Sequence, residues 1–140
     1  MTDPGVVVDA SSLAEYARND LRSLPIDELL RELREDTGGP VYIPLLALEE
    51  AQQILGNDRP ALARLESLVA AHGVKLADAE MLKAVELMAV EGNVSRGLAH
   101  AALLSRLLGT TLATYLAPTL ERAGFDMAKV LDLDEIFRGE

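Results

Sequence analysis

Short apolar runs that alternate with helix-length amphipathic stretches constrain the fold of this chain more than any other feature. Strands separated by helices need crossover connections, which give a mainly parallel sheet covered by helices on both faces. We therefore predict an α/β fold, a three-layer α/β/α sandwich with a four- to five-stranded sheet. Strands are expected at 6–8, 74–76, 111–114 and 129–131, and helices over 11–19, from 23–25 onward, from Ile43 or Pro44 to 55, from 58 to 72–73, after Asp78, over 96–108 and over 118–123.

Length and composition indicate one globular domain over residues 1–140, with an acidic tail at about 132–140 that forms at most one loose turn. Apolar residues make up 49% of the chain, enough for a buried core. No apolar stretch is long enough to span a bilayer, and the N-terminus lacks the features of a secretory signal. The chain has no cysteine, which excludes disulfides and thiolate metal sites. We expect a cytoplasmic protein.

The charge of the chain argues against unaided binding to nucleic acid. Twenty-three acidic residues against thirteen Lys and Arg give a net charge of −10. Nucleic-acid binders usually carry a basic patch that displaces counterions from phosphates, whereas the arginines here are scattered. An acidic chain suits a basic protein partner or is simply soluble.

The apolar run at 6–8 ends at Asp9, and Ala10, Ser11 and Ser12 then start a helix. Ligands of open α/β sheets bind outside the carboxyl ends of the strands, so Asp9 is a candidate site residue. One carboxylate rarely does metal chemistry alone. The function of Asp9 therefore depends on its partners.

Glu50 is the best candidate partner, because helical spacing puts it on one face with Leu46, Ala47 and Ile54. Burial of a carboxylate without a partner costs free energy, so a carboxylate on an apolar face is expected to have water or a cation as its partner. Glu50 could lie at the rim and reach water or pair with an arginine. It could also face a metal ion opposite Asp9, and periodicity alone leaves both interpretations open.

The order and spacing of several segments resemble the PIN domain over nearly the whole chain. These segments are the Val-Val-Asp9-Ala-Ser11 start, Pro44 with an acid six residues later, and the stretch from Leu98-Ala99-His100 through Arg106 and Gly109 to Thr111-Leu112-Ala113-Thr114. Small PIN proteins of this length are typically the ribonuclease toxins of bacterial toxin–antitoxin pairs. The resemblance implies a site of three or four carboxylates around one or two Mg²⁺ or Mn²⁺ ions, which activate water against a phosphodiester.

Matched residue by residue, the resemblance implies that Asp9 is the first family acid and Glu50 the second, with Ser11 as a hydroxyl that supports the first. The third and fourth acids are replaced by Leu98 and Leu116. Thr114 keeps its place before the missing fourth acid. Leu98, Leu116, Ser11, Thr114 and Tyr115 are expected to line the cleft, with Leu98 as part of its wall.

These departures predict a degenerate PIN-like protein, inactive or strongly impaired as a nuclease, that acts by binding protein or RNA. No cofactor is expected, and any Mg²⁺ or Mn²⁺ on Asp9 and Glu50 would be weakly held. The alternative is a Mg²⁺- or Mn²⁺-dependent ribonuclease of toxin–antitoxin type with a reduced acidic site, in which substrate phosphate supplies the missing ligands.

The resemblance also implies a homodimer and an antitoxin-like or other protein partner, whose arginine could pair with Asp9 and Glu50. The apolar stripe of Ile26, Leu29, Leu30 and Leu33 is either a dimer surface or ordinary core. Three further side chains are interpreted as structural. His100 is expected to be a partly buried histidine rather than a ligand, and Met81 and Met88 to face the core.

Overall fold

The computed structural model of the protein describes residues 5–35 and 39–139. Its elements, in chain order, are β1 (Val6–Val8), α1 (Ala10–Arg18), the 3-10 turn η1 (Leu21–Ser23), α2 (Leu24–Glu35), β2 (Val41–Pro44), α3 (Leu45–Leu55), α4 (Arg59–Val69), β3 (Val74–Ala77), α5 (Leu82–Gly92), α6 (Arg96–Leu108), β4 (Thr111–Thr114), α7 (Ala117–Arg122), β5 (Val130–Asp132) and α8 (Leu133–Arg138). Part of the predicted loop at 36–40 lies outside the described residues.

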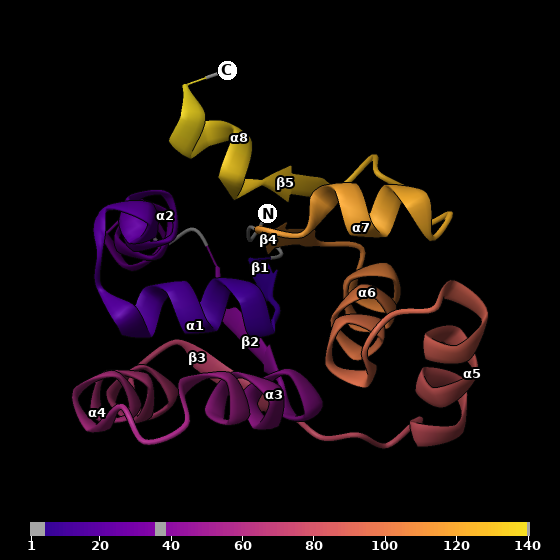
Figure 1. The fold of residues 1–140 in the computed structure, drawn as a ribbon, viewed down its shortest axis with the longest axis horizontal. Coiled ribbons are helices and arrows are strands. Elements are labelled where there is room, and N and C mark those ends of the chain that lie inside the picture. The colour runs from indigo at the N-terminus through magenta and orange to yellow at the C-terminus, as the bar shows by residue number, and fades with distance from the viewer. Residues whose placement is uncertain (1–4, 36–38, 140) are drawn as a thin grey trace.

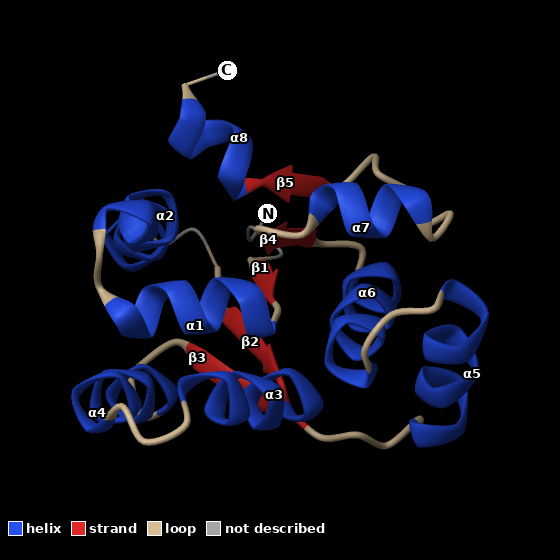
Figure 2. Cartoon of the chain, in the orientation of Figure 1, coloured by secondary structure: helices blue, strands red, loops and turns tan. Residues whose placement is uncertain are grey.

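Five parallel strands form one sheet in the order β3-β2-β1-β4-β5. Helices α1, α2 and α4 lie on one side of it and α5, α6 and α7 on the other (Figures 1 and 2). The predicted three-layer α/β/α fold is confirmed. No helix in the described part of the chain has both the length and the apolar character that crossing a membrane requires.

Successive residues of the strands point into different layers, as the pleat requires. In β1, Val6 and Val8 belong to the core under α1 to α4, whereas Val7 joins Leu98 and Leu112 beneath α6. All three valines are at most 2% exposed, because both faces of the sheet are covered.

Strand β2 was not predicted, because Ile43 or Pro44 was expected to begin a helix. Both residues are in the strand, and the helix begins at Leu45. An apolar run of four residues has no periodicity that separates a buried strand from the first turn of a helix. The four residues form a strand because they pair with β1 on one side and with β3 on the other.

Several helix ends also differ from prediction. Helix α4 ends at Val69 rather than at 72–73, and α5 begins after Met81 rather than after a cap at Asp78. Met81 is 47% exposed, so the expectation that it faces the core is wrong, whereas Met88 is partly buried in a small cluster between α3, α5 and α6. The acidic tail is more ordered than predicted, since it forms α8, whose Leu133 is fully buried.

The apolar stripe on α2 is core. Ile26 and Leu30 are 1% and 2% exposed, and Leu29 and Leu33 pack against the same cluster. The interpretation of this stripe as a dimer surface is therefore wrong, because the chain itself already covers it.

Candidate functional site

Asp9 and Thr114 meet where the strand order reverses direction. From β1 the chain winds outward through β2 to β3, and it then returns to place β4 on the other side of β1. Loops at the carboxyl ends of two such strands turn away from each other and leave a place for a ligand. Asp9 follows β1 and Thr114 ends β4, so this junction is the candidate site.

The Asp9 carboxylate is 1% exposed and receives hydrogen bonds on both oxygens. Oδ1 accepts from the Ser11 hydroxyl at 2.8 Å and from the Ser12 amide at 2.9 Å, and the Ser12 hydroxyl lies at 3.0 Å. Oδ2 accepts from the Thr114 hydroxyl at 2.5 Å. Asp9 is thus also the N-cap of α1, in a capping box with Ser12.

The turn after β4 orients two of these hydroxyls. The Tyr115 amide donates to Ser11 Oγ at 3.0 Å, and the Leu116 amide donates to Thr114 Oγ1 at 2.9 Å. Each hydroxyl thereby accepts from a backbone amide and keeps its own proton for Asp9. The β4–α7 turn is therefore tied to the carboxylate through two hydroxyls.

Burial raises the pKa of the Asp9 carboxyl above its ordinary value of 3.8. Hydrogen bonds from Thr114, Ser12 and Ser11 favour the charged form and oppose that rise without cancelling it. No lysine or arginine forms an ion pair with Asp9 in the described part of the chain.

Glu50 binds the start of α6. Its Oε1 accepts from the Ser95 hydroxyl at 2.8 Å, and its Oε2 accepts from the Gly97 amide at 2.7 Å. A carboxylate is favourable there because the first amides of a helix have no intrahelical partner and carry partial positive charge. Neither interpretation from the sequence included this role, and Ile54, expected on the same apolar face, is 51% exposed.

Position 97 of α6 faces the Glu50 carboxylate. A Cβ atom at Gly97 would lie 2.5 Å from Glu50 Cδ and Oε1. Leu98 instead is 3% exposed and packs with Val7 and Leu112, so the prediction that it forms a cleft wall is wrong. A glycine in the first turn of a helix is the one signal that could have indicated this close approach.

Tyr115 and Leu116 differ in exposure. The Tyr115 side chain is 4% exposed and lies in the core, where its hydroxyl donates to the Arg22 carbonyl at 2.6 Å. Tyr115 therefore contributes its backbone amide, and not its ring, to the surroundings of Asp9. Leu116 is 39% exposed.

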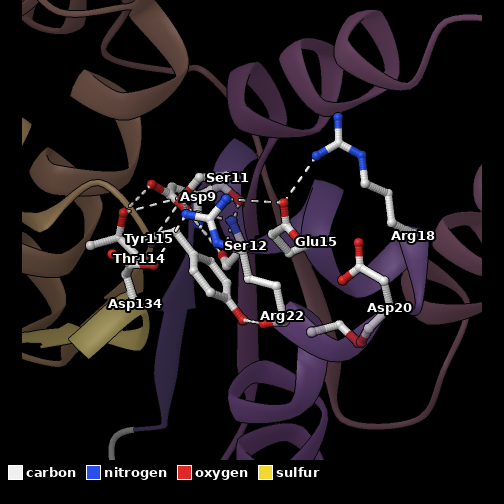
Figure 3. Close-up of polar contacts among 11 residues, drawn as sticks. Asp9, Ser11, Ser12, Glu15, Arg18, Asp20, Arg22, Thr114, Tyr115 and Asp134 are labelled. Carbon is white, nitrogen blue, oxygen red and sulfur yellow. Dashed lines mark hydrogen bonds and ion pairs between the residues drawn. The ribbon is translucent and has the colours of Figure 1, made fainter. Parts of the chain in front are cut away.

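A charged network adjoins Asp9 on the side of α1, η1 and α8 (Figure 3). The Arg22 guanidinium lies 5.0 Å from the centre of the Tyr115 ring, 3.6 Å from Glu15 and 3.4 Å from Asp134. Glu15 is buried and also binds Arg18 at 3.0 Å, while its Oε2 has no hydrogen-bond partner among the described residues. The network joins three elements around Arg22. Neither Glu15 nor Arg22 was predicted as a site residue.

The two acids of the candidate site both have hydrogen-bond partners within the chain. Asp9 accepts hydrogen bonds on both carboxylate oxygens, and Glu50 is bound to the start of α6. Residues 5–35 and 39–139 hold no group of three His, Asp or Glu side chains placed to bind an ion. Mg²⁺ binds oxygen ligands, so an ion at this site would have to share Asp9 and Glu50 with these internal donors.

His100 is 5% exposed, and its Nδ1 accepts from the Leu46 amide at 3.4 Å. Burial lowers its pKa below 6.5, although a hydrogen bond with the Asp78 backbone opposes the change. The neutral ring thus accepts a hydrogen bond from the first turn of α3, which is a structural role.

A cavity of about 660 Å³ opens between α5, α6 and α7. The residues that line it include Ser105, Arg106 and Phe125 but neither Asp9 nor Glu50.

Two solved structures share the fold. One is PAE2754 from Pyrobaculum aerophilum, with a TM-score of 0.65 and 18% identity, over 99% of this chain and 88% of that one. The other is VapC20 of Mycobacterium tuberculosis, described as a sarcin–ricin loop cleaving toxin, with a TM-score of 0.62 and 18% identity, over 89% of this chain and 98% of that one. No protein-family model and no curated protein matches the sequence. The likeness establishes a PIN-like fold.

Proposed function

We propose that this protein is a degenerate PIN-like protein, inactive or strongly impaired as a nuclease, that acts by binding a protein partner. The observation that carries the proposal is the position of Glu50. Its carboxylate accepts hydrogen bonds from the Ser95 hydroxyl and the Gly97 amide, two groups of its own chain.

The residues that face the two remaining acids support the loss of a metal site. Gly97 offers no side chain where one would point at Glu50. Leu116, which directly follows the Thr114–Tyr115 step beside Asp9, offers no ligand either. We therefore assign Gly97, rather than Leu98, to the third acidic position of the PIN pattern. Leu116 stays assigned to the fourth.

An antitoxin-like protein partner and a homodimer belong to the same proposal. They are supported by the fold shared with VapC20, which is described as a toxin, and by a net charge of −10, which favours a basic protein over RNA. Asp9 is too buried to receive an arginine from such a partner, so Glu50, which is partly exposed, is the acid that a partner could reach.

Calorimetric titration with Mn²⁺, beside a cleavage assay on total RNA with Mg²⁺ or Mn²⁺, tests the loss of activity. We expect no saturable Mn²⁺ binding and no metal-dependent cleavage. Cleavage that requires metal and disappears in Asp9→Asn would refute the proposal and establish the alternative, a ribonuclease with a reduced acidic site.

A gain-of-function variant tests the assignment of the two missing positions. Gly97→Asp with Leu116→Asp should confer Mn²⁺ binding, because a bound ion would offset the repulsion between the added carboxylates and the two native acids. Glu50 would have to shift, since a Cβ atom at position 97 would lie 2.5 Å from its carboxyl group. The matched control is Leu98→Asp with Leu116→Asp, which puts an unpaired carboxylate into the core and should unfold the protein rather than bind metal. Mn²⁺ binding by a folded control, or none by the Gly97 variant, would refute the assignment.

A further inference from the structure

The cavity of about 660 Å³ between α5, α6 and α7 is lined by neither Asp9 nor Glu50. Its volume is in the range of pockets that bind ligands in other proteins. Met88, Phe125 and Val130 give it apolar walls, and all three side chains are partly buried. Binding pockets combine such walls with a few polar groups that fix the orientation of the ligand. The charged residues of this cavity therefore indicate what it binds.

Two basic side chains line the cavity where α6 ends. Arg106 is in the last turn of α6, and Gly109 is the C-cap of that helix. Lys129 lies beside them, because its Nζ donates to the Gly109 carbonyl at 2.7 Å. That hydrogen bond uses one of the three ammonium protons. Arg106 forms no ion pair with any residue that the structure describes. This end of the cavity therefore keeps donors for an anionic group.

Two acidic side chains, Glu91 and Asp126, line the other end of the cavity. Glu91 precedes Gly92, where a Cβ atom would lie 3.2 Å from the Phe125 ring, and Asp126 follows Phe125. The close approach of Gly92 and Phe125 thus brings the two acids together from α5 and from the segment after α7. A short turn joins Gly92 to the start of α6, whereas Arg106 is at the end of that helix. The acids and the basic residues therefore lie at opposite ends.

We propose that this cavity binds an extended peptide segment with a free C-terminal carboxylate, apolar residues before it and a basic side chain upstream. The carboxylate lies between Arg106 and Lys129, where a guanidinium can bind it with two parallel hydrogen bonds. The basic side chain lies at Glu91 and Asp126. A purely anionic ligand would leave these two acids unmatched, so the charges at both ends favour the peptide.

The length of the cavity limits the segment to a few residues. Its wall on α6 runs from Ala102 to Gly109, which is about 10 Å at about 1.5 Å per residue. An extended chain covers that length in about three residues. The basic residue should therefore be the fourth from the carboxyl end. Neither Asp9 nor Glu50 takes part, so failure of this proposal would leave the metal-binding tests unaffected.

Titration of the isotope-labelled full chain with the peptide acetyl-Lys-Leu-Ala-Leu, followed by two-dimensional NMR, tests the site. We expect saturable shifts with a Kd of about 1 mM or below, because so short a segment loses much of its contact energy to ordering. The amides of Gly92, Gly109 and Gly124 should shift most, since these glycines line the cavity. The same peptide as a C-terminal amide, or with norleucine in place of lysine, should bind about fivefold more weakly.

Two variants test the two ends of the cavity separately. Arg106→Gln should weaken the free-acid peptide about fivefold and leave the amide peptide unchanged, because only the free acid has a carboxylate to lose. Asp126→Asn should weaken the lysine peptide and leave the norleucine peptide unchanged, and it keeps an oxygen for the Ala128 amide. The matched control is Arg122→Gln, on an exposed position of α7 outside the cavity, which should change neither.

Thermal unfolding checks that each variant is folded, and all three positions are exposed. The proposal would be overturned if the wild-type chain showed no shift at several millimolar peptide, or shifts only outside the cavity. It would also be overturned if the amide peptide bound as tightly as the free acid, or if Arg106→Gln weakened both equally.

Discussion

Substitution of Glu50 distinguishes two roles for this carboxylate, a structural one and that of a metal ligand. The two roles predict changes of opposite sign in the free energy of unfolding of the metal-free protein. In a metal centre, acids crowded without their ion repel each other, so removing one usually stabilises the metal-free protein. Here Glu50 accepts two hydrogen bonds at the start of α6, where the partial positive charge of the helix amides favours a carboxylate. Its removal should therefore destabilise the protein.

The magnitude follows from the two contacts. Glu50→Gln keeps oxygen and nitrogen atoms within reach of Ser95 and Gly97 but loses the charge that the helix start favours, which costs about 1 kcal/mol. Glu50→Ala loses both hydrogen bonds as well, for about 2 kcal/mol in a partly exposed position. For a chain of this size these changes lower Tm by about 4 and about 8 °C.

Urea unfolding and calorimetry in the absence of divalent metal measure both variants. The matched control is Glu49→Gln, because Glu49 precedes Glu50 on α3 and is exposed. It should change the free energy of unfolding by less than about 0.5 kcal/mol. The reasoning is refuted if Glu50→Gln is no less stable than the Glu49 control, or if it is more stable than the wild type.

Three further predictions concern buried polar groups. Because burial raises the pKa of Asp9, the folded state holds this proton to higher pH than the unfolded state, so stability falls as pH rises from about 3.8 through the raised pKa. Asp9→Asn should remove that loss in urea unfolding at a series of pH values. For His100 the pKa is lowered, so the unfolded state takes up its proton first, and stability should fall as pH drops below about 6.5. His100→Gln should flatten this part of the pH profile, and an unchanged slope would contradict the buried neutral ring. Tyr115→Phe should cost about 1 kcal/mol of unfolding free energy, since the Arg22 carbonyl loses its donor.

Local signals predicted much of the fold. The strand at 6–8, the helix start at 58 and the helix over 96–108 were predicted from short-range features, and each matches an element of the structure. Strand β2 was missed because nothing local distinguishes its four residues from the helix that follows. Its identity comes from the two strands beside it, which lie far away in the sequence.

The sequence by itself determined the alternation of strands and helices, and with it the parallel sheet and the place of Asp9 at the end of β1. Periodicity also put Glu50 on the inner side of α3, but it could not name what that carboxylate binds. Only the tertiary structure decided that its partner is the start of α6. The physical reason is that Gly97 contacts Glu50 through its backbone amide, and a backbone contact leaves no pattern of side chains in the sequence. The role of Gly97 is therefore seen only when α3 and α6 are packed together.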